Sequence, residues 1–471
     1  MAQSEIGLIG LGTMGAALSL NIAEKGFGIS VFNRTVARVD AFVKEAGALA
    51  DKITPTRTLE EFVASLAKPR AIVLMVPAGQ AVDAQIVALR PLLDPEDLII
   101  DAGNANFHDT NRRADSAAAA GTAFMGIGVS GGEEGARHGP SIMGGGKAEH
   151  WDRVSHILEA ISAKYDGQPC ATWMGEGGAG HFVKTVHNGI EYADMQLIAE
   201  VYGVMRDGLG LSATQIAAAF EAWNDGTLQS YLIEISAKVA AATDPGTGKP
   251  MLDVILDRAG QKGTGRWTAI EAQQVGVPVP VIEAAVAARN MSAALDARLA
   301  GQSVFGDAPQ TLPDGALDLE TLEAALIAGK ILCYAQGFDL LSRTGGEYGW
   351  RLPMPEIAEV WREGCIIRSA MLNDMASALR DDPARNLMLA PGFTDMVQKS
   401  HGALRKVVSV AALHGLPVPA LSAALGYFDI MRTGRSTANM IQGQRDFFGA
   451  HGFERVDSDG DHHGPWGGAQ G

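Results

Sequence analysis

The chain has 471 residues, enough for roughly two or three domains with sizeable cores. Its hydrophobic content of 47% is that of an ordinary globular protein rather than a disordered one. The formal net charge of −16, from 38 Lys+Arg against 54 Asp+Glu, argues against general nucleic-acid binding. Any site for an anionic ligand must therefore be a local basic cluster.

The three cysteines, Cys170, Cys333 and Cys365, are far apart and have neither metal-ligand spacing nor the pattern of a disulfide framework. They favour a reducing compartment. The first residues, MAQSEIGLIG, lack the basic region of a signal peptide, and we expect no apolar run of membrane-spanning length. The sequence thus predicts a cytoplasmic protein.

Residues 5–9 predict a buried strand that runs directly into Gly10, Gly12 and Gly15, spaced G-x-G-x-x-G. A helix to Lys25 and a second strand at 29–32 should follow. In this context the first glycine permits a tight turn, the second lets a pyrophosphate approach the backbone, and the third lets helix and strand pack closely. The segment predicts dinucleotide binding.

The end of the second strand indicates which dinucleotide binds. NAD-binding folds usually carry Asp or Glu there for the ribose 2′-hydroxyl, whereas this chain has Asn33-Arg34-Thr35. A carboxylate would repel a 2′-phosphate, while a guanidinium and a hydroxyl can bind it. We therefore predict NADP; the alternative is that Arg34 is only a surface residue of the turn.

Strands and helices continue to alternate. Residues 71–76 and 98–100 predict buried parallel strands, and each ends in a loop at the edge where ligands bind. The small residues of loop 128–132 would let backbone amides approach a ligand, although glycine loops are also common turns. A helix at 147–165 and a short strand near 172–174 should complete this domain.

Residues 177–206 have a helical apolar period and no proline, which predicts a helix of roughly 25 residues. Its polar side chains include Lys184, His187, Asn188, Glu191 and Tyr192. At about 100° per residue, Lys184, Asn188 and Glu191 fall within roughly 40° of one another. Burying such groups unpaired costs several kcal/mol each, so either they line a cavity or they form a solvated face with a Lys/Glu pair.

The pattern stays helical to about residue 433. The segment GVPVPVIEAAV from Gly276 is echoed by GLPVPALSAAL from Gly415, which suggests a duplicated helical unit. We predict three domains: a dinucleotide-binding domain at 1–176, an all-helical substrate and dimerisation domain at 177–434, and a tail at 435–471.

Several basic residues remain in the second half. The loop 260–267, GQKGTGRW, suits a phosphate or carboxylate, unless it is a flexible surface turn. Arg289 lies in an alanine-rich helix where an unpaired guanidinium would be unfavourable. The polar tail after residue 452 is of a kind that is disordered unless docked, and Phe453 and Trp466 suggest docking. The adjacent pair at 462–463 is more typical of a tail than of a metal site.

With these segments assembled, the sequence resembles the decarboxylating 6-phosphogluconate dehydrogenases along nearly its whole length. The resemblance rests on the motifs GLIGLGTMG, FNRT, GVSGGEEGARHGPSIM, GAGHFVKTVHNGIEYADMQLI, GQKGTGRWT, WREGCIIR and QRDFFGAHGFERVD. It implies a fold with an α/β Rossmann-type N-terminal domain and a large all-α domain with internal duplication. It also implies a homodimer whose C-terminal tail reaches into the partner subunit.

The implied reaction converts 6-phosphogluconate and NADP to ribulose 5-phosphate, CO₂ and NADPH, without a metal, in the pentose phosphate pathway and gluconate utilisation. By resemblance, Lys184 is the general base that takes the C3 hydroxyl proton, and Glu191 is the general acid that protonates the enediol at C1. A lysine base near neutral pH needs a lowered pKa, so we predict that shift for Lys184.

The remaining site residues follow from the same resemblance. Those that hold the substrate phosphate are Tyr192, Lys262, Arg289, Arg445 and His451, the last two donated by the other subunit. Those on the carboxylate and hydroxyl side are Asn104, Ser130, Gly131, Gly132, His187 and Asn188. Those that contact the cofactor are Gly10, Leu11, Gly12, Thr13, Met14, Gly15, Asn33, Arg34, Thr35, Val76, Pro77, Ala78 and Asn104.

The sequence departs from the family at Pro77, where lysine is common, which removes one possible positive charge near the cofactor. It also departs at Ala102, where glycine is usual; alanine restricts the backbone slightly, but Asn104 remains. One alternative function is that of the shorter β-hydroxyacid dehydrogenases, which share the glycine fingerprint and the helix lysine. They act on unphosphorylated hydroxy acids and would lack the phosphate-binding set. A second alternative is a catalytically silent NADP-binding protein, which the presence of both Lys184 and Glu191 disfavours.

Overall fold

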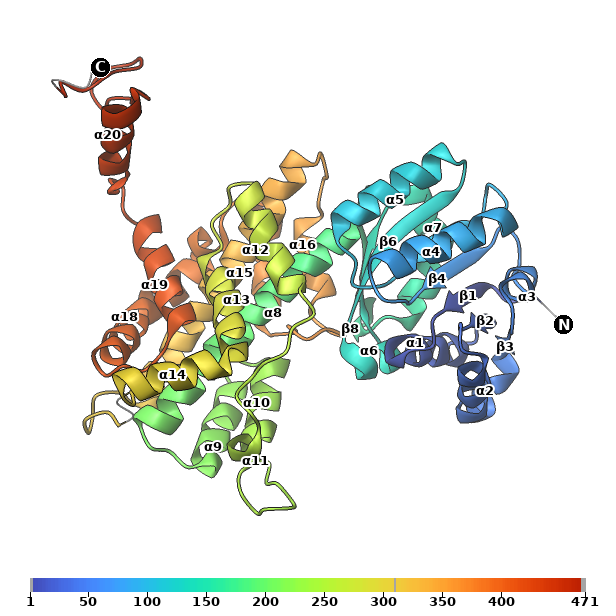
Figure 1. Ribbon diagram of the computed structural model, residues 1–471, viewed down its shortest axis with the longest axis horizontal. Helices are drawn as coiled ribbons and strands as arrows, with labels where there is room; N and C mark the ends of the chain where they lie inside the picture. Colours follow the sequence, from blue (N-terminus) through green and yellow to red (C-terminus); the bar gives the residue numbers. More distant parts are fainter. Residues whose placement is uncertain (1–2, 309–310, 467–471) are drawn as a thin grey trace. The chain divides into compact units, whose positions relative to one another are not determined.

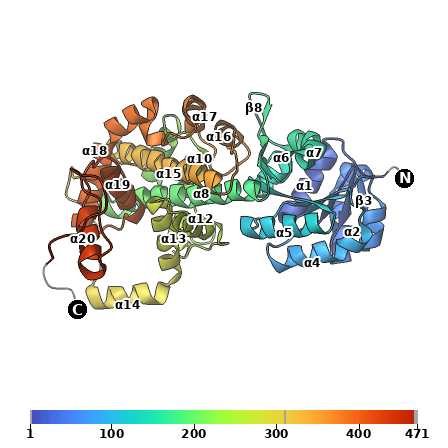
Figure 2. The same ribbon diagram turned by 90° about the horizontal axis from the view of Figure 1, so that it is seen from above.

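The computed structural model describes residues 3–308 and 311–466 (Figures 1 and 2). It divides into two compact units, Met1–Ala424 and Leu425–Gly471. The first unit holds both the sheet and most of the helical part, and the second holds the end of the chain.

An eight-stranded sheet of order β10-β7-β6-β5-β4-β1-β2-β3 forms the N-terminal part. Its strands are β1 (Ile6–Ile9), β2 (Ile29–Phe32), β3 (Ile53–Pro55), β4 (Ala71–Leu74), β5 (Leu98–Asp101), β6 (Ala123–Ser130), β7 (Ser141–Gly145) and β10 (Ala171–Gly175). All neighbours pair in parallel except β6 and β7, which are antiparallel. A hairpin of β8 (Lys164–Tyr165) and β9 (Gln168–Pro169) precedes β10.

Two apolar clusters lie on opposite faces of this sheet. Alternate residues of one strand enter different clusters, as Val73 and Ile72 of β4 do, because successive side chains point to opposite faces. Helices cover both faces, which makes the sheet doubly wound. They are α1 (Thr13–Glu24), α2 (Val36–Glu45), α3 (Leu59–Ala64), α4 (Gln80–Leu89), α5 (Phe107–Ala119), α6 (Gly132–His138) and α7 (Ala148–Ile161). The strand order reverses between β1 and β4, where this fold binds ligands.

Most sequence-based boundaries in this part agree with the structure to within a few residues. The strand predicted at 29–32 has these bounds, and the first helix ends at Glu24 rather than Lys25. The helix predicted at 147–165 is shorter, because α7 ends at Ile161 and the chain then enters β8. The antiparallel pairing of β7 was not predicted, since local sequence does not encode which neighbour a strand joins.

The helical part is built around two long helices, α8 and α15, which pack along each other (Figure 2). The helices of this part are α8 (Ala179–Gly203), α9 (Ala213–Asn224), α10 (Tyr231–Ala241), α11 (Met251–Val254), α12 (Thr264–Gln274), α13 (Pro280–Ala293), α14 (Leu295–Phe305), α15 (Leu319–Glu347), α16 (Met354–Val360), α17 (Met371–Asp381), α18 (Pro391–Leu413) and α19 (Pro419–Met431). A buried ion pair joins the two long helices, with Lys330 Nζ 2.8 Å from Asp194 Oδ2. Breaking such a pair from one side leaves an uncompensated buried charge.

The first end of α8 contacts the sheet, packing on β6 and β7. A Cβ at Gly180 would lie 2.5 Å from the carbonyl oxygen of Met143, so glycine is what lets α8 start this close to β7. The segment predicted as one helix at 177–206 is therefore anchored to the cofactor-binding part at one end. Its helical run ends in a π-helical turn, Val204–Gly208.

By length and composition α15 could cross a membrane, with a mean hydropathy of 1.3 in its most apolar window. The expectation that no apolar run reaches that length was wrong for this helix. However, 83% of the window is buried inside the protein, which is what a core helix shows.

The two echoed sequence segments adopt the same local structure. Gly276 and Gly415 have φ of +67° and +70°, and a helix begins at Pro280 after the first and at Pro419 after the second. Proline suits the first turn of a helix because its missing N–H would be unpaired there anyway. The duplication of the whole helical unit remains a prediction.

Candidate active site

The glycine-rich turn has the geometry that a pyrophosphate requires. Gly10 has φ +107°, and a Cβ on Gly15 would lie 1.9 Å from the Gly10 carbonyl oxygen. A Cβ on Gly12 would meet nothing within 4 Å, so this position opens to solvent. Gly12 precedes α1 without a side-chain cap, which leaves the first N–H groups of the helix for an anion.

The end of β2 presents cationic and hydroxyl groups and no carboxylate. Asn33 ties this turn to the glycine loop, because its Oδ1 accepts from Leu11 N at 3.1 Å and its Nδ2 donates to Thr35 O at 3.2 Å. Arg34 and Thr35 are exposed, and within residues 3–308 and 311–466 the Arg34 side chain has no hydrogen-bonding partner. These groups fit a 2′-phosphate, with Asn33 in a role that is at least partly structural.

Arg113 of α5 holds together the two further loops expected at the cofactor edge. Its side chain is 1% exposed; Nη2 donates to the carbonyl of Gly79 at 3.0 Å, and Nη1 lies 3.4 Å from Asp101 Oδ2. Asp101 Oδ1 accepts from Gly103 N at 3.1 Å. This arrangement fixes the loop from which exposed Asn104 projects, with Ala102 buried in place of the usual glycine.

A cavity of about 520 Å³ lies where these loops meet α8, α12 and α13. Its lining residues are Met14, Asn104, Val129, Ser130, Gly131, Gly132, Lys184, Asn188, Glu191, Tyr192, Gly260, Gln261, Lys262, Thr264, Arg289 and Ile366. Most substrate-binding residues predicted for the first unit are thus brought together. Ile366 was not singled out, although it lies inside the WREGCIIR motif; its apolar side chain gives no chemical signal by itself.

Lys184 is buried on the wall of this cavity, with 7% of its surface exposed. Its Nζ donates to Ser130 Oγ at 2.8 Å and lies 3.4 Å from His187 Nδ1. A Cβ at Gly128 would lie 2.4 Å from Lys184 Cβ, so the glycine in β6 lets the lysine stem pack against the sheet. Burial lowers the pKa of Lys184, although the nearby Glu191 carboxylate opposes that shift.

His187 does not line the cavity but lies fully buried behind Ser130 and Lys184. Burial lowers the pKa of His187 well below its usual value, so the ring is neutral near pH 7. Its Nδ1 is 3.0 Å from Asn188 Oδ1, which can only accept, so we assign the ring proton to Nδ1. Nε2 can then accept from the Ser130 hydroxyl at 3.3 Å, and that hydroxyl can still accept from Lys184.

Glu191 lies about two helical turns after Lys184 on α8, with 22% of its side chain exposed. Burial raises the pKa of Glu191, against the opposing effect of Lys184 and Arg289. The lysine pKa is therefore lowered and the glutamate pKa raised in the same cavity. Opposite shifts of this kind are what assign a base and an acid in one site.

The other side of the cavity suits a phosphate. Arg289 stacks on the ring of Tyr192, with Cζ 3.8 Å from the ring centroid, which accounts for the guanidinium in an alanine-rich helix. Lys262 is exposed on the loop that precedes α12, and Gly263, with φ +94°, leads into Thr264 at the start of that helix. Two cations and a helix N-terminus therefore face one end of the cavity.

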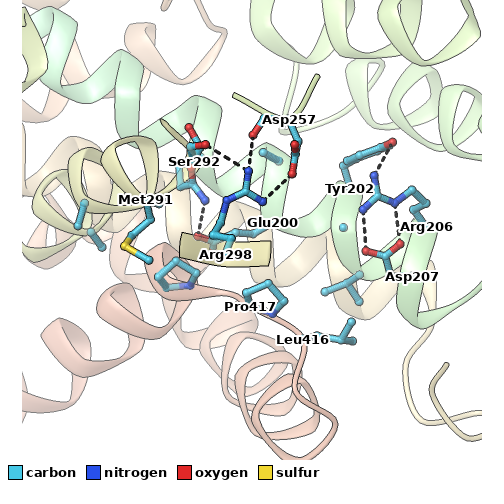
Figure 3. Close-up of a pocket in the computed structure, with 18 residues that line it drawn as sticks. Glu200, Tyr202, Arg206, Asp207, Asp257, Met291, Ser292, Arg298, Leu416 and Pro417 are labelled. Carbon is cyan, nitrogen blue, oxygen red and sulfur yellow. Dashed lines mark hydrogen bonds and ion pairs between the residues drawn. The ribbon is translucent and has the colours of Figure 1, made fainter. Parts of the chain in front are cut away.

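A second cavity, of about 560 Å³, lies farther along α8 (Figure 3). Its guanidinium groups are already paired, Arg206 with Asp207 and Arg298 with Asp257, each at 2.6 Å. Although slightly larger, it lacks an acid–base pair with opposed pKa shifts and is not the candidate active site. One acid in it matters for stability: Glu200, whose carboxylate accepts from the N–H groups of Ala420 and Leu421 at 2.7 and 2.9 Å.

Arg445 and His451, expected from the partner subunit, belong to the second compact unit, Leu425–Gly471. They lie on and just after α20 (Ala438–Gly449). Within that unit Trp466 packs near Phe447, and His463 pairs with Asp446. The tail therefore has internal structure of its own.

Comparison with known proteins identifies relatives over the full chain. The family model for the NAD binding domain of 6-phosphogluconate dehydrogenase matches residues 5–175, and that for the C-terminal domain of 6-phosphogluconate dehydrogenase matches residues 180–466. The Bacillus subtilis NADP(+)-dependent decarboxylating 6-phosphogluconate dehydrogenase is 48% identical over 99% of this chain and 100% of its own. A second Bacillus subtilis enzyme, named as NAD(+)-dependent, is 45% identical over 98% of this chain and 99% of its own. The solved structure of Plasmodium falciparum 6-phosphogluconate dehydrogenase superposes with a TM-score of 0.94 at 41% identity, covering 98% of this chain and 100% of that one.

Proposed function

Because this chain belongs to the 6-phosphogluconate dehydrogenase family, we propose that Lys184 and Glu191 carry its chemistry as base and acid. The protein is an NADP-dependent oxidoreductase that converts 6-phospho-D-gluconate to D-ribulose 5-phosphate and CO₂. The observation that supports the assignment is the buried Lys184 amine, bonded to Ser130, in a cavity that Glu191 also lines.

When bound at the glycine turn, NADP supplies a hydride acceptor. Neutral Lys184 takes the proton of the substrate C3 hydroxyl as the hydride leaves C3, which produces a ketone β to the carboxylate. The lysine, now an ammonium, returns that proton to the ketone oxygen as the carboxylate departs as CO₂ and its bonding electrons form an enediol. Glu191, whose pKa burial raises, gives its proton to the carbon that lost CO₂, and Lys184 removes the remaining hydroxyl proton. Transfer of a proton from lysine to glutamate then restores both groups.

Ser130 and His187 prepare the base for this work. Ser130 fixes the Lys184 amine by accepting a hydrogen bond from it. Burial lowers the pKa of His187, so its ring adds no positive charge beside the amine. We propose that Asn104, Gly131, Gly132 and Asn188 bind the carboxylate and hydroxyl groups beside them. Lys262, Arg289 and Tyr192 bind the phosphate at the other end of the cavity.

NADP is held, in this proposal, by the turn Gly10–Gly15 and by Arg34 and Thr35. Relatives named for NADP and for NAD both match this chain at similar identity, so the family alone does not decide how strictly one is preferred. The exposed guanidinium at Arg34 and the missing carboxylate support NADP. NADPH absorbance on addition of 6-phosphogluconate, with NADP or NAD and with CO₂ measured alongside, tests the activity and the preference together; an equal rate with gluconate would contradict the phosphate site.

We further propose a homodimer in which the partner subunit's Arg445 and His451 complete the phosphate site. In the second unit, α20 exposes large apolar side chains, which a covering surface would shield from water: Met440, Ile441, Phe447 and Phe448. Domain limits at 176/177 and 434/435 and a cytoplasmic location belong to the same proposal. The location is supported by three buried, unpaired thiols.

Intersubunit complementation tests the shared site. With 6-phosphogluconate far below the KM of the Arg445→Ala variant, Lys184→Met and Arg445→Ala subunits should each be nearly inactive as homodimers. A mixed dimer would pair one intact base with one intact tail, so random mixing should recover roughly a quarter of the wild-type rate. No recovery in mixed dimers of verified composition would mean that each tail serves its own subunit.

A further inference from the structure

The segment 450–466, which follows α20, folds back onto the carboxylate of Asp446. Asp446, on α20, has a side chain that is 1% exposed. Its two oxygens accept from four N–H groups: Oδ1 from Gly452 N at 3.0 Å and His463 Nδ1 at 2.6 Å, and Oδ2 from Gly464 N at 2.8 Å and Trp466 Nε1 at 2.6 Å. These donors come from both ends of segment 450–466, so one side chain fixes where the segment leaves the helix and where it returns.

The hydrogen bonds keep this carboxylate ionised. The N–H of Gly464, with His463, Trp466 and Gly452, holds the pKa of Asp446 well below its usual range. The same contact raises the pKa of His463. The group therefore acts as a fixed acceptor at any pH at which the enzyme would work.

His451 sits in the part of the tail that this carboxylate holds most directly. It lies between Ala450, with φ +49°, and Gly452, with φ +70°, so the backbone makes a tight left-handed turn there. Asp446 binds the N–H of Gly452, and Gln442, one helical turn earlier, donates to the carbonyl of Gly452 at 2.5 Å. The imidazole then packs edge-on against Phe448, with ring centroids 5.9 Å apart.

Arg445 is fixed from the same helix turn. Its Nη1 donates to Gln442 Oε1 at 3.2 Å, and it directly precedes Asp446 in α20. Gln442 therefore contacts both the Arg445 guanidinium and the carbonyl of Gly452, whose N–H Asp446 binds, so Arg445 and the backbone beside His451 are tied to the same turn of α20.

We propose that Asp446 is a positioning residue for phosphate binding: it preorders the tail so that Arg445 and His451 approach the substrate as one rigid pair. This inference rests on the proposed phosphate role of those two residues. It goes further in assigning their spacing to a carboxylate that makes no substrate contact. Preordering matters because a segment that must be ordered on binding loses affinity.

The test is Asp446→Asn in the full-length dimer. Asn keeps the size but cannot accept four N–H bonds, so the KM for 6-phosphogluconate should rise roughly 10- to 100-fold, the scale on which misplaced contacts act. The KM for NADP should stay within about twofold, since the proposed cofactor site, the glycine turn with Arg34 and Thr35, includes none of the residues that Asp446 contacts. The matched control is Asp457→Asn, an exposed tail carboxylate paired with Arg455, which makes the same charge change and should leave both KM values unchanged.

A double-mutant cycle separates positioning from general tail stability. In an Arg445→Ala, His451→Ala background, adding Asp446→Asn should change the KM for 6-phosphogluconate little, because nothing remains to be positioned. A full, additive effect there, or an equal rise in the KM for NADP, would overturn the inference. If Asp446→Asn does not assemble, Trp466→Phe removes a single donor to the same carboxylate and should raise the KM for 6-phosphogluconate several-fold; no rise would refute the proposal.

These measurements also distinguish the phosphate role of Arg445 and His451 from the positioning role of Asp446. If Arg445→Ala and His451→Ala each leave the KM for 6-phosphogluconate unchanged, the proposed role of the tail fails and this inference fails with it. If those variants raise the KM and both Asp446→Asn and Trp466→Phe do not, the phosphate role stands and only the positioning role of Asp446 is wrong.

Discussion

Replacing Lys184 with methionine should separate activity from stability. Methionine keeps an unbranched side chain of similar length in a position that is 7% exposed, and it removes only the amine that contacts Ser130. A general base contributes roughly 10²–10⁴-fold, so kcat should fall by that factor, about 3–5 kcal/mol in activation free energy. Loss of the single Lys184–Ser130 hydrogen bond, by contrast, accounts for only about 1 kcal/mol, or less than tenfold.

The same substitution should not destabilise the fold. Burial lowers the Lys184 pKa, so the folded state disfavours the charged amine that the unfolded chain carries below pH ~10.4. At a pH below the pKa of Lys184 in the folded state, the cost of burying the charged amine lowers the free energy of unfolding by its full amount. That cost disappears as the pH rises from the pKa of the folded state to that of the unfolded chain. The variant should therefore have a Tm at or above that of the wild type near neutral pH, with the difference shrinking as pH rises toward 10.

NADPH absorbance gives the rate, calorimetry gives Tm, and fluorescence titration gives NADP affinity, which should be nearly unchanged. Lys238→Met, which removes an exposed lysine from α10, is the matched control and should alter none of the three. Turnover within tenfold of the wild type would refute the base assignment. A loss of rate accompanied by a lower Tm and weaker NADP binding would show that the amine supports structure rather than chemistry.

Three further substitutions test other parts of the structure. Glu191→Gln should lower kcat by roughly 10²-fold or more. In the wild type, burial raises the Glu191 pKa, so kcat should fall as the pH rises through that pKa. A Glu191→Gln variant that lost this alkaline fall but kept full activity would exclude the acid role. Arg34→Glu should raise the KM for NADP by about 100-fold while changing that for NAD only a few-fold, because it replaces a cation with a repelling carboxylate; equal losses would remove the 2′-phosphate argument. Glu200→Gln should remove a pH-dependent loss of stability. Burial raises the pKa of Glu200 to about 7 from an ordinary 4.5, so the folded state favours the neutral acid. This contributes about 3 kcal/mol to the free energy of unfolding, which is fully present below pH 4.5 and is lost as the pH rises through 7. Calorimetry should find a wild-type Tm that falls against the variant between pH 5 and 8, and parallel curves would contradict the shift.

Local sequence predicted the cofactor-binding part well because its signals are short-range. The glycine turn requires positive φ at Gly10 and close packing at Gly15, and few residues other than glycine allow either. The helical period placed Lys184, Asn188 and Glu191 on one line, and all three line one cavity. The lowered Lys184 pKa was predicted from its role as a base, and burial gives the shift that direction.

What the sequence did not reveal depends on contacts between distant segments. His187 was expected on the cavity wall but lies behind it, because Ser130 from β6 comes between. Gly128 looked like part of a small-residue loop, and only the approach of α8 shows that it makes room for Lys184. Asp446 is one acid among many in the sequence, and its burial depends on donors that return from later in the chain.

The contact between Gly128 and Lys184 limits how this chain can be recombined. The base belongs to the helical half by sequence, yet the wall that shields it from water belongs to the dinucleotide-binding half. A chimaera that joined a foreign nucleotide-binding half at residue 176 would keep Lys184 but supply a different neighbour. A Cβ at position 128 would lie 2.4 Å from Lys184 Cβ, so the strand or the lysine stem would have to shift, and any gain in exposure would weaken the burial that lowers the Lys184 pKa. The environment of the base therefore depends on both halves of the chain, through a position in β6 that leaves no room for a Cβ.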